Sequence, residues 1–364
     1  MPKIKVQLKT SPARSYNIII ENGLAKKIPT ILKTQNWGQK YAIISDSTVT
    51  KLYGNKLLKD LKQFGIKAHI ISFSSGDKHK TLETCQKILN QLLIKNFDRK
   101  DAIIALGGGV TGDIAGFCAS IFKRSIPYLH IPTTLLSMTD SSIGGKTGVN
   151  LTAGKNLAGT IYQPQAILID PNFLKTLPLT ETLCGISEVL KYGIIKSPKL
   201  FESIEKNGKI PGSALMNNLI IQACKIKAEV IEKDEFETGE RIILNYGHTI
   251  GHAIEKLSNY KIKHGQAIAI GIKLTNEMSL NHNLINKSDH LRINNLIKKL
   301  NLTGISQKSL LTTKSANKLW QIIQSDKKNI AGKVRFIIVP KIGTTKLYDK
   351  FTKKDLISAL KNYA

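Results

Sequence analysis

Two histidines stand four residues apart in the segment 244–255, and a third follows soon after. His248 and His252 would share one face of a helix, because side chains four residues apart on a helix are neighbours. His264 is far enough along the chain for it to turn and bring back a third imidazole. The chain has eight histidines, so this grouping favours a metal or anion site over a surface helix with incidental histidines. Spacing alone makes His248 and His252 the expected pair of ligands. Thr249 stands where a zinc protease needs glutamate, which excludes that class.

A glycine-rich segment at residues 107–113 follows an apolar stretch that is typical of a strand. Gly107, Gly109 and Gly112 fit the pattern GxGxxG, and residues 114–122 are expected to be helical. Such a loop lets the backbone approach a pyrophosphate at a helix N-terminus. No acid lies about twenty residues further on to hold a ribose, as the standard layout requires. A tight turn that needs glycine explains the pattern equally well.

A second polar segment, residues 132–150, is dense in hydroxyls and glycine, and lysine and asparagine side chains lie in it and just after it. Backbone N–H groups, hydroxyls and ammonium groups in such a segment suit a phosphate. Asp140 occupies the place of the first glycine of a P-loop, so the Walker pattern is absent and ATP hydrolysis is disfavoured.

Apolar stretches that predict strands alternate with helical patterns in the first half of the chain. This alternation predicts a mostly parallel sheet covered on both faces. The expected strands are 41–45, 68–73, 101–106, 128–132 and 166–170, with an alternating stretch at 1–8 and a clear helix at 81–95. After residue 176 helical periodicity dominates, at 180–196, 214–234, 247–257, 266–282 and 289–300, with one late strand at 334–340. We therefore expect an α/β domain at residues 1–176 and a mostly helical domain at 177–364.

Composition is that of an ordinary globular protein, with 41% hydrophobic and 22% charged residues among 364, which is enough for two cores. No stretch is long and apolar enough to span a bilayer, and the start lacks a signal peptide's apolar core. The four cysteines are widely spaced and predict reduced thiols in the cytoplasm.

The net charge of +28 raises the question of a nucleic-acid partner. The lysines are scattered, however, and the chain is equally rich in Asn and Ile, which like Lys have A/T-rich codons. No basic run with interleaved aromatic residues occurs. We therefore expect charged, solvated faces, with no nucleic-acid or membrane partner.

Taken together, the motifs resemble the 3-dehydroquinate synthase family of the shikimate pathway, within the wider group of sugar-phosphate cyclases and metal-dependent polyol dehydrogenases. They occur in the family's order over nearly the whole chain, at 75–80, 107–113, 140–150, 187–193, 234–241, 245–255, 264–265 and 326–328. The resemblance implies a Rossmann-like, mostly parallel α/β domain followed by a mostly α-helical, metal-binding domain.

The resemblance implies a metal site of Glu188, His248 and His264. Carboxylate and imidazole ligands with open positions suit Zn²⁺, and Co²⁺ is chemically acceptable. His252 would then face the substrate phosphate, so the resemblance overrules the spacing of the first two histidines.

The implied substrate is 3-deoxy-D-arabino-heptulosonate 7-phosphate, a small molecule that carries a carboxylate and a phosphate. Four residues match the phosphate-side positions, with Lys155 beside them: Lys146, Asn156, Asn245 and His252. Arg124 matches an arginine that the family takes from the neighbouring subunit, which implies a homodimer. The carboxylate side is matched by Lys227, Arg241 and one of Lys327 and Lys328. Asp140 and Lys191 would hold hydroxyl groups.

NAD is the implied cofactor, and Asp46 matches the acid that holds the adenosine ribose, which the glycine loop lacks. The full set of expected NAD contacts is Asp46, Thr48, Lys51, Ser75, Gly76, Asp77, Lys78, His79, Lys80, Gly109, Val110, Thr111, Gly112, Asp113, Thr133, Thr134, Lys146, Lys155, Phe173, Leu174, Lys175 and Thr176. The implied reaction oxidises the substrate transiently, eliminates phosphate, returns the hydride and closes the ring by an aldol step, so that NAD ends unchanged.

Four positions depart from the family's usual residues. Gln266 and Asp77 replace glutamates, Ser125 replaces a glycine, and Thr48 replaces an asparagine. Three alternatives remain open. A cyclase for another sugar phosphate would not need several cations for a carboxylate, and a polyol dehydrogenase would accumulate NADH. A nucleic-acid-binding module would be retained on DNA or RNA in a salt-sensitive way.

Overall fold

A computed structural model describes residues 15–304, 310–325 and 334–363, and the strand expected at residues 1–8 lies outside them. The chain divides into two compact units. The N-terminal unit contains residues 1–131 and 145–169, and the C-terminal unit contains residues 132–144 and 170–364. The single boundary expected after residue 176 therefore needs correction, because the segment 132–144 packs with the helices that follow residue 170.

The N-terminal unit is built on a six-stranded sheet in the order β1-β8-β5-β4-β2-β3. β2 runs parallel to β3 and β4, and β8 runs parallel to β1 and β5. The strands are β1 (Asn17–Ile20), β2 (Tyr41–Asp46), β3 (Ala68–Phe73), β4 (Ala102–Gly107), β5 (Tyr128–Pro132) and β8 (Ala166–Ile169). All five strands expected in this half are confirmed, and β1 is an additional one.

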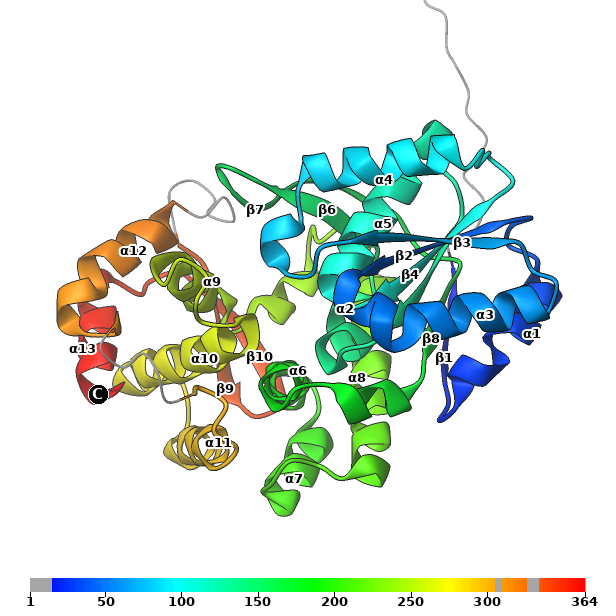
Figure 1. Ribbon diagram of the computed structural model, residues 1–364. Helices are drawn as coiled ribbons and strands as arrows, with labels where there is room; N and C mark the ends of the chain where they lie inside the picture. Colours follow the sequence, from blue (N-terminus) through cyan, green and yellow to red (C-terminus); the bar gives the residue numbers. More distant parts are fainter. Residues whose placement is uncertain (1–14, 305–309, 326–333, 364) are drawn as a thin grey trace, which may run out of the picture. The chain divides into compact units, whose positions relative to one another are not determined.

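Helices cover both faces of this sheet, as near-continuous apolar strands require. They are α1 (Ile28–Gln35), α2 (Ser47–Val49), α3 (Asn55–Gln63), α4 (Leu82–Ile94) and α5 (Gly109–Ile121). Ala42 and Ile44 pack in one cluster with α4 and α5. Tyr41 and Ile43 alternate with them on β2 and are equally buried. Figure 1 shows α4 above these strands and α3 below them.

The strand order of the sheet changes direction between β2 and β4, since β3 is added on one side of β2 and β4 on the other. In open parallel sheets the crevice beyond the carboxyl ends of two such strands is the usual ligand site. Asp46 ends β2, and the glycine-rich turn follows β4. The fold thus brings the expected ribose acid and the expected nucleotide loop to the same edge.

An antiparallel hairpin, β6 (Lys146–Leu151) with β7 (Gly154–Ile161), takes up part of the polar segment that the sequence left unassigned. The two strands approach closely at paired glycines. A Cβ atom on Gly159 would lie 2.0 Å from the carbonyl oxygen of Thr147. The close approach of the two strands therefore explains the glycines here as well as a phosphate site would.

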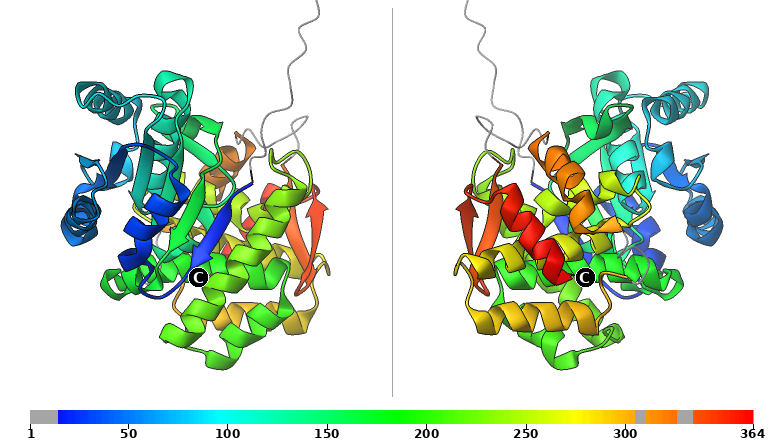
Figure 2. Two further views of the ribbon diagram at one scale, coloured as in Figure 1. Left: turned by 90° about the vertical axis from the view of Figure 1, so that its right-hand side faces the viewer. Right: turned by 90° about the vertical axis from the view of Figure 1, so that its left-hand side faces the viewer.

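The C-terminal unit is mostly helical, as expected. Its helices are α6 (Leu179–Ile195), α7 (Pro198–Asn207), α8 (Ser213–Lys233), α9 (His248–Leu257), α10 (His264–Asn281), α11 (Lys287–Lys299), α12 (Ala316–Gln324) and α13 (Lys353–Tyr363). The late strand is β9 (Phe336–Lys341), and its partner β10 (Thr344–Tyr348) was not expected. Figure 2 shows this hairpin and α13 at the red end of the chain. Phe336, Ile338 and Leu356 join them to α9 and α10 in one core.

α9 and α10 pack unusually closely, which matters because they carry the histidines. A Cβ atom on Gly271 would lie 2.1 Å from the carbonyl oxygen of Gly247. Gly247 itself has φ +76°, a left-handed conformation in which a side chain is strained. No helix in the described part of the chain is long and apolar enough to cross a membrane.

Candidate metal and substrate site

α6, α9 and α10 bring three potential metal ligands together in the C-terminal unit. Oε1 of Glu188 lies 3.5 Å from Nε2 of His248 and 3.4 Å from Nε2 of His264. The ligand atoms of these three residues all lie within 4.8 Å of one another. The two imidazoles therefore point the same nitrogen at one carboxylate oxygen.

The other nitrogen of each imidazole is already engaged. Nδ1 of His248 lies 3.0 Å from the carbonyl oxygen of Tyr246, and Nδ1 of His264 lies 3.2 Å from Oε2 of Glu255. An acceptor at Nδ1 fixes the tautomer and leaves the Nε2 lone pair for a cation. Glu255 received no role from the sequence, although a carboxylate at the end of the double-histidine helix was a usable signal.

His252 lies among the same rings but does not join the first group. Its ring centroid is 5.2 Å from that of His248 and 5.9 Å from that of His264. It belongs to a second possible ligand group, with Glu255 and His264. The geometry of Glu188 with two Nε2 atoms favours the ligand set implied by the resemblance over the His248–His252 pair expected from spacing.

The carboxylate of Glu188 fits a divalent cation. Glu188 is fully buried, its Oε1 faces the two imidazole Nε2 atoms, and its Oε2 lies beside the ammonium of Lys191. Burial would raise the pKa of Glu188, but the ammonium of Lys191, 2.5 Å from Oε2, helps to bring it below its usual value. A buried, ionised carboxylate beside two imidazoles is a donor set that suits Zn²⁺ or Co²⁺.

A second charged group adjoins Glu188. Asp140, in a π-helical turn at Ser137–Ser141, accepts hydrogen bonds from Lys227 on α8 and Tyr192 on α6. Burial would raise the pKa of Asp140, but Lys227 and Lys191 hold it well below the usual range. Lys227 was expected on the carboxylate side, whereas the structure pairs it with Asp140. Tyr192 was assigned no role from the sequence.

Arg241 lies in a 3₁₀ helix, Glu240–Asn245, and one carboxylate organises the loop before it. Asp234 accepts from the backbone N–H groups of Thr238, Gly239 and Arg241. Arg241 is 2% exposed, and its guanidinium donates to the carbonyl oxygen of Glu235. This loop leads into the 3₁₀ helix, at whose end Asn245 donates to Oε1 of Glu237, 3.1 Å away. Expected substrate contacts Arg241 and Asn245 thus lie on one short, tethered segment.

In the N-terminal unit, several expected phosphate and NAD contacts interlock. The buried ammonium of Lys80 donates to Asp113 and to Oδ1 of Asn156. Lys155 pairs with Asp77 at 3.0 Å. Asp77, which stands where the family usually has the longer glutamate, therefore still pairs with a cation. The hairpin β6–β7 is thereby fastened to the segment 75–80 and to the start of α5.

Asn150 is the link that makes this possible, and its residue type alone predicted no such role. Its backbone N–H donates to the carbonyl oxygen of Lys80, 2.8 Å away, and its Oδ1 accepts from the backbone N–H of Asn156. Its amide nitrogen lies 3.3 Å from Oδ2 of Asp77.

The expected nucleotide loop is a helix start. α5 begins at Gly109, earlier than expected, so Gly109 to Asp113 form its first turns. A Cβ atom on Gly112 would lie 2.2 Å from Cε1 of His130 on β5, which explains that glycine by helix–strand packing. Asp46 caps α2 through the N–H groups of Thr48 and Val49, and Thr111 Oγ1 lies 3.5 Å from its Oδ2.

The remaining expected residues fall in several places. Lys51 lies in a π-helical turn, Thr50–Gly54, and residues 75–79 form a turn after β3. Thr134 Oγ1 accepts from the N–H of Ser137, and Thr133 is buried. Phe173, Leu174, Lys175 and Thr176 form a 3₁₀ turn. Lys327 and Lys328 lie outside the described residues.

Two departures from the family's usual residues acquire a structural meaning. Gln266 accepts from the backbone N–H of Lys263 at the start of α10, so it caps a helix rather than supporting the metal ligands. Ser125, beside Arg124, has φ 100° and ψ 135°, a conformation that favours glycine.

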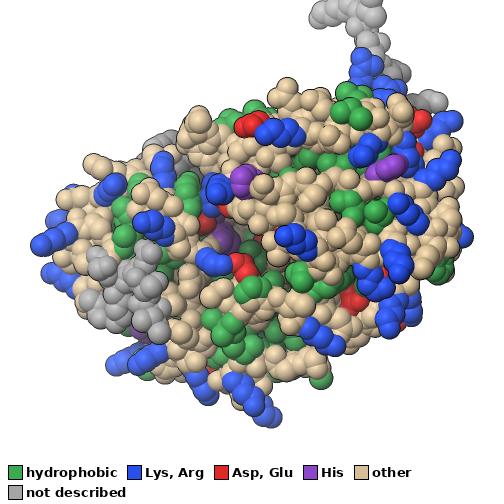
Figure 3. Space-filling view, viewed as in Figure 1, with side chains coloured by type: hydrophobic (Ala, Val, Ile, Leu, Met, Phe, Trp, Pro, Cys, Tyr) green, Lys and Arg blue, Asp and Glu red, His purple; other side chains and the backbone are tan. Residues whose placement is uncertain are grey.

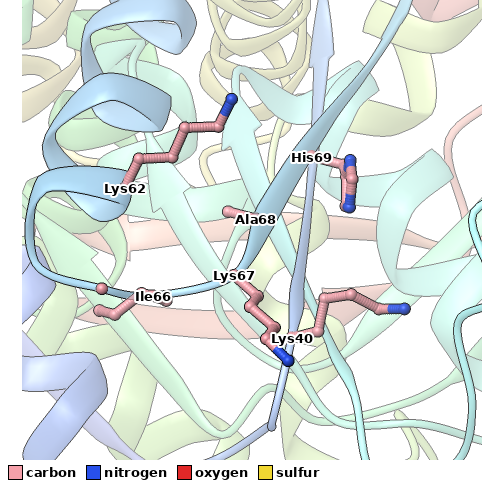
Figure 4. A pocket seen from close by; sticks show the side chains of 7 residues that line it. Lys40, Lys62, Ile66, Lys67, Ala68 and His69 are labelled. Atoms are coloured by element: carbon pink, nitrogen blue, oxygen red, sulfur yellow. The ribbon is translucent and has the colours of Figure 1, made fainter.

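Within the residues that the structure describes, basic side chains elsewhere do not form a comparable site. Figure 3 shows lysine and arginine scattered over the visible face, as expected for solvated charge. A shallow pocket in the N-terminal unit is lined by Lys40, Lys62, Lys67 and His69, and the three lysine ammonium groups point in different directions (Figure 4). Lys40 donates hydrogen bonds to the carbonyl oxygens of residues 95 and 96.

Solved structures with the same fold define the class of the protein. 2-Epi-5-epi-valiolone synthase from Streptomyces hygroscopicus, solved with NAD⁺ and Zn²⁺ bound, superposes with a TM-score of 0.88 at 25% identity, covering 98% of this chain and 99% of that one. 2-Deoxy-scyllo-inosose synthase, solved with carbaglucose-6-phosphate, NAD⁺ and Co²⁺, gives 0.84 at 27% identity, covering 94% and 95%. The fold and the clustered ligands are those of a sugar-phosphate cyclase.

Sequence comparison defines the family within that class. Residues 70–184 match the model of the 3-dehydroquinate synthase N-terminal domain, and residues 185–329 match that of the C-terminal domain. The 3-dehydroquinate synthases of Thermodesulfovibrio yellowstonii and Pelagibacter ubique are 42% and 38% identical to the chain, each over 99% of both sequences. The chain belongs to the 3-dehydroquinate synthase family. It is a lyase-type cyclase, and its function is 3-dehydroquinate synthesis in the shikimate pathway.

Proposed function

We propose that this enzyme converts 3-deoxy-D-arabino-heptulosonate 7-phosphate into 3-dehydroquinate and phosphate with the help of NAD and one divalent metal ion. The observation that supports this most directly is the convergence of Glu188 Oε1 with two histidine Nε2 atoms at 3.4–3.5 Å. The charged residues around them suit a substrate that is both polyhydroxylated and anionic.

Glu188, His248 and His264 would hold the metal, Zn²⁺ or Co²⁺. A bound divalent cation acts as a Lewis acid on substrate oxygens and lowers the pKa of a hydroxyl group. NAD⁺, when bound, supplies a reversible hydride acceptor. The structures with NAD⁺ and Zn²⁺ or Co²⁺ are of related cyclases and support these assignments by analogy.

The chain's own residues bind and orient the substrate. Asp140 and Lys191 are proposed to hold its hydroxyl groups, and Arg241, with Lys227, to neutralise its carboxylate. Lys227 already donates to Asp140 at 2.6 Å, so we assign it a share in both tasks. His252, Asn245, Lys146 and Asn156 are proposed to bind the phosphate. Cations and oriented donors at these places stabilise the charge that develops as phosphate leaves.

We further propose a cytoplasmic homodimer. The four cysteines are free and buried, which suits a reducing compartment. Arg124 matches an arginine that the family supplies from a neighbouring subunit, so it is proposed to complete the partner's site.

The decisive experiment follows phosphate release from 3-deoxy-D-arabino-heptulosonate 7-phosphate with NAD⁺ and Zn²⁺ present, while absorbance of NADH is recorded. Phosphate release without net NADH is expected, because the hydride is returned to the substrate. Stoichiometric NADH would indicate a dehydrogenase. Faster turnover of sedoheptulose 7-phosphate would indicate a different cyclase.

The metal assignment predicts that His264→Ala loses both bound metal and activity. The substitution removes one of two imidazole ligands and exposes the buried Glu188 carboxylate to an unfilled gap. Metal content after dialysis is measured by atomic emission. His282→Ala is the control, because the imidazole of His282 pairs with Asp355 and not with the proposed metal ligands. Full activity of His264→Ala without retained metal would refute the ligand set.

A further inference from the structure

Tyr192 lies on α6 directly after Lys191, and its side chain is fully buried. Its hydroxyl donates to Oδ1 of Asp140. The ammonium of Lys191 lies 5.1 Å from the centroid of its ring. A buried phenol usually finds some acceptor, and for many core tyrosines that is a backbone carbonyl. Here the acceptor is the carboxylate of an expected substrate contact.

The two oxygens of Asp140 are in different situations. Oδ1 accepts from Tyr192 and from Lys227, whose Nζ is 2.6 Å away. No residue in the described part of the chain donates to Oδ2 in hydrogen-bond geometry, and the side chain of Asp140 keeps 22% of its surface exposed. The carboxylate is therefore held through one oxygen and presents the other.

The backbone that carries Asp140 is independently fixed. Thr139 Oγ1 donates to the carbonyl oxygen of Leu135, 2.8 Å away, and Cys224 Sγ lies 3.3 Å from that of Met138. Nζ of Lys227 also donates to the carbonyl oxygen of Asp140 at 2.6 Å. The remaining freedom is rotation of the carboxylate, a torsion with only weak intrinsic preference.

Lys227 alone does not define that rotation. An ammonium group is a compact charge on a flexible stem, with donors that rotate. A phenol on a packed helix has its O–H restricted by the ring plane, so it adds direction to the charge that lysine supplies.

We propose that Tyr192 is a positioning residue, which together with Lys227 holds Oδ1 of Asp140 so that Oδ2 accepts a hydroxyl group of the substrate. The inference rests on the proposed function, which supplies a polyhydroxylated substrate. Tyr192 acts as a hydrogen-bond donor and transfers no proton. Burial, followed by the charge of Asp140, raises the pKa of Tyr192 well above its usual value.

Tyr192→Phe in the NAD⁺- and Zn²⁺-loaded enzyme tests this role, because it keeps the ring and removes the donor. We expect kcat/KM to fall roughly 10- to 100-fold, the usual cost of losing a hydrogen bond to a charged group. The matched control is Tyr128→Phe, a buried tyrosine of the N-terminal unit whose hydroxyl donates to the carbonyl oxygen of residue 162. That control should keep its activity, although the lost hydrogen bond lowers its melting temperature.

A double-mutant cycle separates positioning from general packing. In an Asp140→Asn background, Tyr192→Phe should cause little further loss of kcat/KM. Where turnover is too slow, calorimetric binding of 3-dehydroquinate to the loaded variants gives the same cycle.

The outcomes distinguish this inference from the function on which it rests. The role of Tyr192 would be overturned if Tyr192→Phe caused the same loss of kcat/KM with and without Asp140. It would also be overturned if Tyr192→Phe were as active as Tyr128→Phe. In both cases phosphate release by the unsubstituted chain would still uphold the reaction. No phosphate release by the unsubstituted chain would overturn the reaction and this role together.

Discussion

At the scale of single residues, the orientation of a metal ligand depends on a neighbouring carboxylate outside the proposed ligand set. Glu255 accepts from Nδ1 of His264 and is itself 6% exposed. Burial would lower the pKa of His264, but its contacts with Glu188 and Glu255 raise it to about 10. The two carboxylates thus orient this imidazole through both of its nitrogens.

Glu255→Gln is expected to weaken Zn²⁺ binding about 10- to 100-fold, since outer partners of ligating histidines commonly matter to that extent. The amide keeps the shape but loses the charge that polarises the imidazole. Competition with a chromophoric chelator measures the affinity without reference to catalysis.

Glu277→Gln is the matched control for Glu255→Gln, because Glu277 also pairs with a buried histidine, His290, at 3.1 Å. Equal zinc affinity in both variants would show that Glu255 is only a packing residue.

The backbone beside Arg124 holds a second prediction at this scale. Lys123, Arg124 and Ser125 all have positive φ, and Ser125 has the least favourable geometry of the three. Ser125→Gly is expected to stabilise the protein by about 1 kcal/mol, because glycine adopts this conformation without strain. Thermal or urea unfolding measures the gain.

Asn36→Gly serves as the comparison for Ser125→Gly. Asn36 also has positive φ, at 47°, but asparagine tolerates that left-handed region. A gain at Ser125 no larger than the gain at Asn36 would argue against strain there.

The residues that sequence reasoning missed share a physical cause. Tyr192, Glu255 and Asn150 act through other residues, so the metal and substrate motifs assign them no role of their own. The clustering of Glu188 with two histidines from three helices could be anticipated through the resemblance. Their spacing alone pointed to His248 and His252, because helical periodicity carries no information about a third helix.

At the scale of elements, strongly periodic segments were predicted well. The helices α4, α6, α8, α9, α10 and α11 and the strands β2, β3, β4, β5, β8 and β9 lie where the sequence placed them, within a few residues. The hairpin β6–β7 escaped because glycines and hydroxyls in its strands are typical of loops. β10 and α13 escaped because their apolar positions are few. Pairing with β9 determines β10, and contact with α10 and α12 determines α13.

The loop before Arg241 gives a pH-dependent prediction. Burial would raise the pKa of Asp234, but three backbone N–H groups, those of Thr238, Arg241 and Gly239, bring it down to about 2 from 3.8. The folded pKa lies below the unfolded one, so the stabilisation is complete above about 4 and is lost as the pH falls through 2.

Asp234→Asn should therefore cost about 2 kcal/mol of unfolding free energy at neutral pH, and the difference from the unsubstituted protein should shrink between pH 4 and 2. Urea unfolding at several pH values measures it. Asp60→Asn, which removes a carboxylate that pairs with Lys56 on the surface of α3, is the control. A difference that stays constant down to pH 2 would contradict the role of the carboxylate charge.

At the scale of the whole molecule, the proposed sharing of Arg124 between subunits is open to a complementation test. Arg124→Ala and Lys146→Ala should each be inactive alone. Mixed dimers of the two, isolated through both tags, should recover about half of full activity, because one of the two sites in each two-fold mixed dimer is intact. Phosphate release from co-expressed, doubly tagged dimers measures it.

Mixed dimers of Lys146→Ala and Asp140→Ala provide the control for this test. Both residues are proposed to serve the same subunit's site, so every site in these dimers carries one defect. Recovery in the control, or none in the Arg124 mixture, would contradict sharing across subunits.

The division of the chain into two units was the least predictable feature of the whole molecule. Periodicity correctly indicated a change from α/β to helical structure, but it could not show that residues 132–144 leave the first unit before residues 145–169 complete it. Such a detour is set by contacts far apart in sequence, which no local pattern records.

That detour gives the protein an order of assembly during its synthesis. The N-terminal unit has all its residues once the chain has emerged to residue 169, whereas the segment 132–144 must wait for α6 and α8. Leu135 and Met138, which end up fully buried, stay uncovered on the growing chain until then. The ribosome therefore exposes an apolar loop on an already folded unit, at the stage when chaperones find such surfaces. α6 and α8, which are made after the N-terminal unit, are the helices that conceal it.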